Sequence, residues 1–301
     1  MSLTDVPDPT SAALKQQVAD AANALAGRPA PPVEPAAGER LAPALAAAWT
    51  VEGFVVLRGA VDAALVQAVN DQAVELVRTL ARDGEDLGGY RRGDGLISVP
   101  EPNLADRAAT APEDHVSKLF NLHRRGAFAE VARLPAVVEV LCGLLGPDVD
   151  CFNSQFIFKN PGAWGQPWHQ DSLYFDLDRV PQVGMWLATS PATPDNGCLF
   201  VAPGSHLEPL HHHVPDRRPD ANLGYLEIVD HDFSGEVPVE MEPGDVLLFH
   251  SFLMHRSGDN RSASRRTALV HHYTPAGTAP VGPPSATIDF ARVATGFTPV
   301  G

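Results

Sequence analysis

The sequence predicts a mainly β domain with flanking helices, which is an α+β chain. Up to about residue 145, apolar residues recur at the helical period, whereas from residue 151 onward the apolar runs are short and rich in β-branched and aromatic residues. Turn residues separate these later runs, and no internal repeat of fixed period is present. The four clearest turns are Asn160-Pro161-Gly162, Asp195-Asn196-Gly197, Pro203-Gly204-Ser205 and Pro243-Gly244-Asp245.

Length and charge narrow the class of protein. The chain has 301 residues, which is ordinary for one β-sandwich or barrel with helical additions. Its formal net charge of -15 argues against nucleic acid and against an anionic membrane surface, because both require a basic patch. An odd count of 3 cysteines fits a reduced compartment, and we see no secretory signal or membrane span. We expect a cytoplasmic protein, monomer or homodimer, with a small-molecule substrate.

The N-terminal elements are expected in this order. Residues 1–40 are rich in Ala and Pro and predict a partly flexible arm, with a helix over 14–25 that ends before the prolines. The remaining residues, 41–301, are expected to form a single domain. It should begin with a short helix over 44–50 and a buried strand over 53–57, since Phe and Val dominate that run.

In the middle of the chain, the sequence pattern predicts three further helices, followed by the strands. A long amphipathic helix is expected over 62–82, because its apolar residues follow one helical face. Residues 83–115 are polar with Gly and Pro, and predict a loop. Two helices are expected over 116–124 and 135–145. The expected strands then cover residues 152–159, 183–190, 198–201, 245–250 and 267–273.

One long segment interrupts the predicted strands. Residues 206–236 are polar and rich in histidine, and no strand pattern is evident in them. Loops of this length inside a compact domain are usually functional. We therefore expect this segment, together with residues 83–115, to act as a lid that selects the substrate.

A metal site is predicted by His169 and Asp171, which are two residues apart. Side chains at i and i+2 of a strand leave the same face, so these two groups would point at one spot. His255, after a distant apolar strand, would add a second imidazole. Two histidines and one carboxylate with open positions opposite are typical of non-haem Fe(II) oxygenases. Arg266, at the start of the next strand, could pair with the far end of a dicarboxylate co-substrate.

Spacing alone leaves other interpretations open. The chain has 12 histidines, so one His-x-Asp match can arise as an ordinary hydrogen-bonded pair. His206 and Glu208 have the same spacing, and the histidines at 211–213 could bind metal adventitiously. The same three ligands could also hold zinc in a hydrolase. They could equally belong to a non-catalytic cupin-like metal-binding protein.

Several motifs in one order make the chain resemble the phytanoyl-CoA dioxygenase family of Fe(II)- and 2-oxoglutarate-dependent oxygenases. The resemblance covers about residues 45–275, and together the motifs are highly specific. They are Glu52-Gly53-Phe54-Val55-Val56-Leu57-Arg58-Gly59, Phe158-Lys159-Asn160-Pro161-Gly162, Trp168-His169-Gln170-Asp171, Trp186-Leu187-Ala188, Asp195-Asn196-Gly197-Cys198-Leu199, Val201-Ala202-Pro203-Gly204-Ser205-His206, Pro243-Gly244-Asp245 and His255-Arg256-Ser257.

The resemblance implies a fold and a set of site residues. The fold is a double-stranded β-helix, the jelly-roll core of cupin-like proteins. Fe(II) would be held by His169, Asp171 and His255, with 2-oxoglutarate and O2 as co-substrates. The residues that match the family's 2-oxoglutarate positions are Arg266, Ser257, Gln155, Lys118 and Trp186. His206 would close a structural Pro-Gly-Ser-His turn and would not be a ligand. His250, His271 and His272 receive no ligand role and are expected to pack or line the pocket.

The activity that the resemblance implies is hydroxylation, with release of succinate and CO2. A carboxylate at position 171 leaves no ligand position for a halide, which favours hydroxylation, desaturation or ring closure over chlorination. An acyl-CoA substrate is the alternative, but the CoA nucleotide prefers a basic pocket, and this acidic chain offers only local arginine pairs. We therefore expect the substrate to be a small metabolite or a natural-product intermediate.

Overall fold

The computed structural model describes residues 12–32, 34–36, 41–87, 91–93, 95–103, 110–218, 221, 225–281 and 297–300. The helices are α1 (Ala12–Asn23), α2 (Pro43–Glu52), α3 (Ala63–Arg82), α4 (Gly126–Ala132) and α5 (Pro135–Leu145), with short 3-10 helices η2 (Pro112–His115), η3 (Asp171–Leu173), η4 (Pro194–Asn196) and η5 (Ser205–Leu207). The strands are β1 (Phe54–Leu57), β2 (Arg91–Gly93), β3 (Leu96–Pro100), β4 (Val116–Phe120), β5 (Val149–Lys159), β6 (Val183–Ala188), β7 (Leu199–Val201), β8 (Val214–Pro215), β9 (Leu226–Glu227), β10 (Val237–Val239), β11 (Val246–His250), β12 (His255–Ser257), β13 (Arg266–Pro275) and β14 (Thr298–Pro299).

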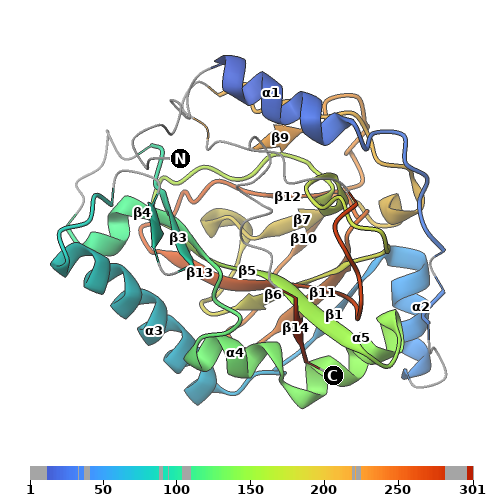
Figure 1. Ribbon diagram of the computed structural model, residues 1–301, viewed down its shortest axis with the longest axis horizontal. Helices are drawn as coiled ribbons and strands as arrows, with labels where there is room; N and C mark the ends of the chain where they lie inside the picture. Colours follow the sequence, from blue (N-terminus) through green and yellow to red (C-terminus); the bar gives the residue numbers. More distant parts are fainter. Residues whose placement is uncertain are drawn as a thin grey trace.

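Two antiparallel sheets pack face to face and form the centre of the fold (Figure 1). The large sheet has the order β1-β11-β6-β13-β5-β4-β3-β2, with β14 paired to β5, and the small sheet has the order β10-β7-β12. Between them, Trp186, Leu247 and Val270 of the large sheet pack with Leu199 and Val201 of the small sheet. This arrangement confirms the mainly β prediction.

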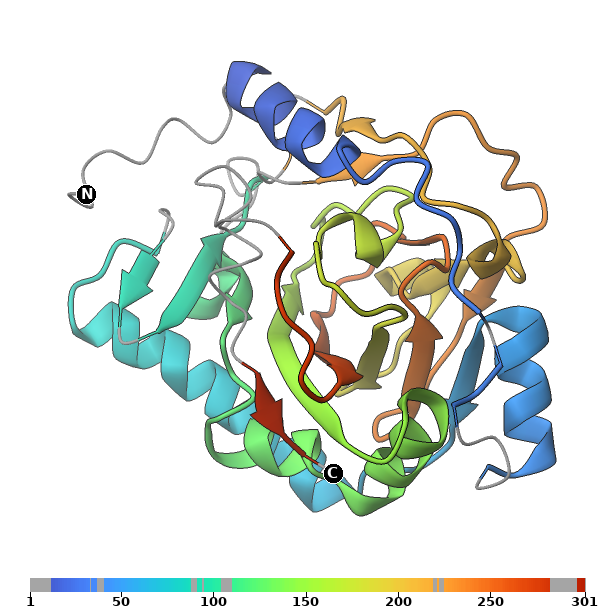
Figure 2. The same cartoon turned by 45° about the vertical axis from the view of Figure 1, so that its right-hand side comes forward.

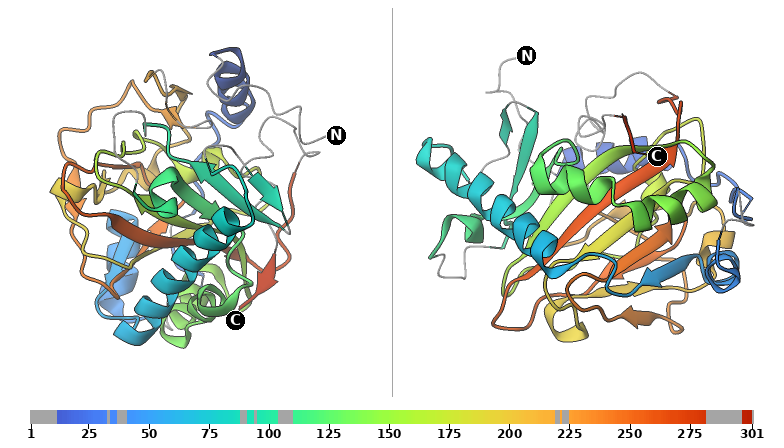
Figure 3. Two further views of the ribbon diagram at one scale, coloured as in Figure 1. Left: turned by 90° about the vertical axis from the view of Figure 1, so that its left-hand side faces the viewer. Right: turned by 90° about the horizontal axis from the view of Figure 1, so that it is seen from below.

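Helices α3, α4 and α5 cover the outer face of the large sheet, as the view from below shows (Figure 3). Helix α3 is amphipathic, and its Val69 and Val77 are fully buried. They belong to the same apolar cluster as Phe156 of β5 and Leu269 of β13. The outer face of the sheet is therefore a hydrophobic layer, which leaves the inner face available for a polar site.

The predictions for residues 83–124 are wrong in two places. Residues 116–124, expected as a helix, contain strand β4, and residues 83–115, expected as a loop, contain β2, β3 and η2. Strand β4 pairs with β3 on one side and β5 on the other, so that Lys118 lies opposite Val99 and Ile157. These partners are distant in sequence, and pairing with them overrides the local helical pattern. Helix α4 is not predicted by the periodicity at all.

The other expected elements are confirmed with ends shifted by a few residues. They include the helices over 44–50, 62–82 and 135–145 and the strands of the β portion. Asp62 starts α3 as its N-cap, because its Oδ1 accepts the backbone N–H of Leu65 at 2.8 Å. No helix of the described residues has the length and apolar character needed to cross a membrane.

Helix α1 lies beside the β8–β9 hairpin of the segment 206–236 (Figure 2). Ala19 is buried there against Leu226 of β9. The side-chain amide of Asn23 donates to the carbonyl of His213 at 2.6 Å and accepts its N–H at 2.9 Å. Part of the predicted arm thus forms a helix that packs on the predicted lid. The arm was predicted to be partly flexible over residues 1–40, and of these, residues 1–11, 33 and 37–40 lie outside the described residues.

Candidate metal centre

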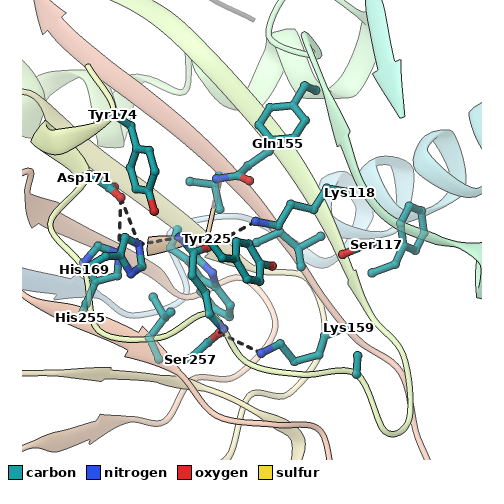
Figure 4. Close-up of a pocket in the computed structure, with 18 of the residues that line it drawn as sticks. Ser117, Lys118, Gln155, Lys159, His169, Asp171, Tyr174, Tyr225, His255 and Ser257 are labelled. Carbon is teal, nitrogen blue, oxygen red and sulfur yellow. Dashed lines mark hydrogen bonds and ion pairs between the residues drawn. The ribbon is translucent and has the colours of Figure 1, made fainter. Parts of the chain in front are cut away.

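Three donor side chains meet at one end of the space between the sheets (Figure 4). His169 precedes η3, Asp171 begins η3 and His255 begins β12. An antiparallel bridge joins the backbones of His169 and His255, with N···O distances of 2.9 and 3.0 Å. One ligand atom of each side chain lies within 4.8 Å of the others. Within the described ranges, this is the one group of three or more such side chains that could hold a metal ion.

Both imidazole rings present Nε2 to the centre as an acceptor. The Nδ1–H of His169 donates to the carbonyl of Pro167 at 2.7 Å, and that of His255 donates to the carbonyl of Leu253 at 3.0 Å. Because a carbonyl only accepts, each Nδ1 carries the proton and each Nε2 keeps its lone pair. Burial lowers the pKa of His255 to about 4, so this ring is neutral at neutral pH. Neutral imidazole is the form that binds metals.

Asp171 is a buried carboxylate that the surrounding imidazoles keep ionised. Its Oδ1 lies 3.4 Å from His169 Nε2 and 3.6 Å from His255 Nε2. Its Oδ2 accepts a hydrogen bond of 2.9 Å from His272 Nε2. Burial raises the pKa of Asp171, but His255, His169 and His272 outweigh this effect and hold the pKa well below its usual range. The centre therefore combines two imidazole nitrogens with one anionic oxygen.

The residues on either side of Asp171 are anchored by buried hydrogen bonds. Gln170 points away from the centre, and its Nε2 donates to the carbonyl of Phe252 at 3.0 Å. The Ser172 hydroxyl lies 2.6 Å from that of Ser251. Both Gln170 and Ser172 are fully buried. These contacts fix the direction in which the carboxylate of Asp171 leaves the backbone.

His255 is supported from behind by the ring of Phe249, whose centroid lies 4.8 Å from that of the imidazole. Phe249 can lie there because position 184, on the neighbouring strand β6, is a glycine. A Cβ added to Gly184 would lie 2.2 Å from Phe249 Cζ. A side chain at position 184 would therefore displace the aromatic ring that packs against His255.

The other end of the same pocket is cationic. Arg266 of β13 and Lys159 of β5 are direct partners in the sheet, and both are buried. Arg266 donates to the carbonyl of Gly197 at 2.9 Å, but within the described residues its Nε and Nη1 have no hydrogen-bond partner. Burial lowers the pKa of Arg266 to about 10, which still leaves it protonated at neutral pH. Burial and the neighbouring Arg266 lower the pKa of Lys159 well below its usual range, and its Nζ already donates to the Ser257 hydroxyl and the Gly258 carbonyl. Arg266, with its two unused N–H groups, is therefore the side chain that calls for an anion.

Strands β5 and β13 form a continuous floor between the two ends. Residues two apart on a strand share a face, and Arg266 and His272 are six apart, which places their backbones about 20 Å from each other. Their sheet partners on β5 are Lys159 and Asn153. All four side chains line the one pocket. Since His272 contacts Asp171, the metal donors lie at the His272 end and the cations at the Arg266 end.

The five residues that the resemblance assigns to 2-oxoglutarate all line this pocket: Lys118, Gln155, Trp186, Ser257 and Arg266. The Trp186 ring centroid lies 5.2 Å from the guanidinium carbon of Arg266. The Ser257 hydroxyl accepts from Lys159 Nζ and from the Gln166 backbone N–H, each at 2.9 Å. Lys118 Nζ donates to Gln166 Oε1 at 3.4 Å. Distant parts of the chain therefore bring all five to one surface.

The second His-x-carboxylate spacing does not form such a site. His206 is fully buried, with its ring 5.3 Å from that of His250. Glu208 instead bonds His211 Nε2 at 2.9 Å and His231 Nε2 at 3.1 Å, inside the segment 206–236. The turn before His206 separates the two side chains, as the family resemblance implies.

Several pocket residues were not among the predicted site residues. Lys159 shares a face of β5 with Gln155, and His272 shares a face of β13 with Arg266, so strand alternation could have indicated both. His272 was expected only to pack or line the pocket. Gln166, whose Nε2 donates to His169 Nε2 at 3.0 Å, lies in an irregular loop.

Tyr225 reaches the pocket from the segment 206–236. Its ring lies under the Lys118 ammonium, 4.7 Å from centroid to Nζ (Figure 4). The neighbouring Leu226 N–H donates to the Tyr174 hydroxyl at 3.3 Å, next to η3. No periodic pattern marks position 225, so the sequence carries no comparable signal for it. The contact is visible only once the chain is folded.

Comparison with known proteins agrees with the motifs. A family model described as phytanoyl-CoA dioxygenase matches residues 49–268. A probable phytanoyl-CoA dioxygenase of Caenorhabditis elegans is 33% identical over 190 residues, which are 60% of this chain and 61% of that protein. The peroxisomal phytanoyl-CoA dioxygenase of Bos taurus is 28% identical over 232 residues, or 74% of this chain and 66% of that protein. The match thus covers less than two thirds of either relative.

Solved structures share the fold. EctD from S. alaskensis with 2-oxoglutarate and 5-hydroxyectoine has a TM-score of 0.62 and 25% identity, and 82% of each chain is covered. EctD with bound Fe has a TM-score of 0.63 and 25% identity, over 82% of this chain and 83% of that one. The non-haem monooxygenase ThoJ, in its apo form, has a TM-score of 0.60 at 23% identity, over 79% and 80%. The facing sheets and these likenesses confirm the jelly-roll core.

We expect Gly184→Ala to weaken divalent metal binding about tenfold or more, because the added Cβ displaces Phe249 and frees the ring of His255. Anaerobic titration calorimetry measures the affinity, with His169→Ala as the reference for a lost ligand. Gly235→Ala is the matched control, since its added Cβ meets nothing within 4 Å. Unchanged affinity in Gly184→Ala would contradict the supporting role of Phe249.

Proposed function

The chain belongs to the phytanoyl-CoA dioxygenase family, and from this we propose that it is an Fe(II)- and 2-oxoglutarate-dependent oxygenase. One observation carries the proposal: a single pocket holds a two-histidine, one-carboxylate donor set and, at its other end, the buried guanidinium of Arg266 with N–H groups that no described residue uses. The donor set suits Fe(II), because three protein ligands leave three positions for co-substrate and O2. His169, Asp171 and His255 are the proposed ligands.

A dicarboxylate co-substrate has one group for each end of this pocket. One carboxylate and the keto group would meet the metal, and the other carboxylate would meet Arg266. A buried N–H without an acceptor costs about 1–3 kcal/mol, and Arg266 has two such atoms within the described residues. The Ser257 hydroxyl, already an acceptor for Lys159 and Gln166, can donate its own proton to the same carboxylate. We assign Lys118, Gln155 and Trp186 to the walls of this subsite.

The chemistry divides between the bound groups and the chain. Iron and 2-oxoglutarate would supply an oxidation by O2 that places one oxygen atom in the substrate and one in succinate, with release of CO2. The chain binds and orients the reactants. Gln166 donates to His169 Nε2 and accepts from Lys118. A metal on His169 requires this amide to turn away, which also frees Lys118 for the co-substrate.

We propose that the substrate is a small metabolite or a natural-product intermediate. The two arginines of the segment 206–236 are already paired: Arg217 with Glu227 at 2.8 Å, and Arg218 with Asp216 at 2.5 Å. Little positive charge is therefore left for the phosphates of CoA. An acyl-CoA substrate is the second candidate, and the names of the curated relatives favour it.

The segment 206–236 is proposed to cover the pocket. Tyr225 places it against Lys118, and the Leu226 N–H ties it to Tyr174 beside the metal donors. Glu101 and Pro102, from the segment 83–115, line another part of the wall. Contacts on both sides of the opening would let the cover respond to what the pocket contains.

The function is tested by screening a metabolite library for compounds that stimulate succinate release in the presence of Fe(II), 2-oxoglutarate and O2. We expect a stimulating compound to gain one oxygen atom or lose two hydrogens in mass spectrometry. Activity that persists without O2 and works with zinc would instead support the hydrolase interpretation. Complete absence of 2-oxoglutarate turnover, with metal and co-substrate bound, would support a non-catalytic protein.

Arg266→Ala should raise the KM for 2-oxoglutarate more than tenfold, because it leaves a buried carboxylate without its partner, at a cost of about 2 kcal/mol or more. Steady-state succinate formation measures this. Arg265→Ala is the control, since the Arg265 guanidinium bonds Asp114 and Asn160 outside the pocket. A near-normal KM in Arg266→Ala would move the anchor to another cation, with Lys118 next.

Amide hydrogen exchange tests whether the segment 206–236 covers the pocket. Backbone amides of the segment 206–236 should exchange faster than those of β5 and β13 in the metal-free protein, and should slow when Fe(II) and 2-oxoglutarate bind. Tyr225→Ala should remove most of that slowing, because it removes the contact with Lys118. His212→Ala, an exposed residue of the same segment, is the control. Equal slowing in both variants would show that Tyr225 does not couple the segment to the pocket.

A further inference from the structure

The two oxygens of Asp171 face different partners. Oδ1 lies near both ligand histidines, 3.4 Å from one Nε2 and 3.6 Å from the other. Oδ2 lies 2.9 Å from His272 Nε2. Because an ionised carboxylate only accepts, the proton of this hydrogen bond is on His272 Nε2. Oδ2 is thereby held on the side away from the space that a metal between the two histidines would occupy.

His272 is itself held so firmly that it fixes the carboxylate rather than following it. The residue is 2% exposed. Its backbone pairs with Asn153 of β5 and Gly184 of β6, in the middle of the large sheet. Its ring packs against Phe175 at 4.9 Å and Phe152 at 6.0 Å between centroids. A ring fixed by strand pairing and by two aromatic neighbours gives its Nε2–H one direction.

We infer that His272 is a positioning residue that keeps Asp171 a single-oxygen ligand. A chelating carboxylate must bring both oxygens to the metal, and the hydrogen bond from His272 opposes the rotation that would do so. This inference rests on the proposed function. Three single-atom protein ligands leave three positions on an octahedral ion, and 2-oxoglutarate and O2 need all three. A second oxygen from Asp171 would take one of them.

The test separates metal binding from co-substrate binding. His272→Phe keeps a ring of similar size but removes the donor, and His272→Gln keeps an N–H near the place of Nε2. Metal affinity is measured by anaerobic calorimetry without co-substrate. The affinity of the Fe(II)-loaded protein for 2-oxoglutarate is measured from its visible charge-transfer band without O2. His271→Phe is the matched control, because His271 lies on the opposite face of β13 and bonds the Tyr273 hydroxyl.

We expect His272→Phe to weaken 2-oxoglutarate binding at least tenfold, and by more than it weakens metal binding, with His272→Gln within about threefold of the unchanged protein. His271→Phe should leave both affinities near normal. Equal loss in His272→Phe and His271→Phe would show a merely structural role and overturn the inference. So would a normal 2-oxoglutarate affinity in His272→Phe.

Should His272→Phe fail to fold, His272→Asn replaces it, because that shorter amide cannot reach Oδ2. We then expect His272→Asn to weaken 2-oxoglutarate binding at least tenfold, while His272→Gln keeps an affinity within about threefold of the unchanged protein. Equal 2-oxoglutarate affinity in the Asn and Gln variants would overturn the inference. Failure of the proposed function has a different signature: the unchanged protein, loaded with Fe(II), would form no charge-transfer complex with 2-oxoglutarate at all.

Discussion

The site depends on keeping one carboxylate, Asp171, ionised where water hardly reaches it. An isolated buried charge would be neutralised, because its desolvation costs several kcal/mol. Here three imidazoles surround it and hold its pKa well below the usual range despite burial. Two of them, His169 and His255, are joined to each other through backbone hydrogen bonds. The N–H of His272 donates to Oδ2 of this charge, whereas Oδ1 and the Nε2 lone pairs of His169 and His255 face a common point, which suits a cation.

Side chains of β5 and β13 alternate between the two faces of the large sheet, and this alternation links the metal donors to the hydrophobic core. Outer-face residues such as Phe156 and Leu269 pack under the helices, and inner-face residues such as Arg266 and His272 line the pocket. A slip of one residue in either strand would exchange the two sets. The hydrophobic layer under α3 and α5 therefore fixes the register that separates the cations from the metal donors.

Much of this could be predicted from the sequence, and the exceptions share a physical cause. Turn chemistry and strand alternation predicted the β portion, since those signals are local. The His169, Asp171 and His255 group was predicted from spacing and motif order, but the expected strand is absent there: Asp171 begins η3, and the bridge between His169 and His255 brings the groups together. Strand β4, which carries Lys118, was mistaken for a helix because its stability comes from pairing with β3 and β5, which lie outside the local sequence window. Tyr225 and the bond between His272 and Asp171 depend on how distant segments meet, and no local pattern encodes that.

The net charge of the chain and the charge inside the pocket have opposite effects on an anionic co-substrate. The chain carries a formal net charge of -15, which repels a dianionic co-substrate at long range. Salt screens that repulsion beyond about 10 Å, whereas Arg266 would act on the co-substrate in a buried, weakly screened place. Binding strength would then come from contact with this guanidinium rather than from attraction at a distance. An acidic surface and a cationic pocket end are therefore compatible, and their combination disfavours large polyanions that would have to lie on the surface as well.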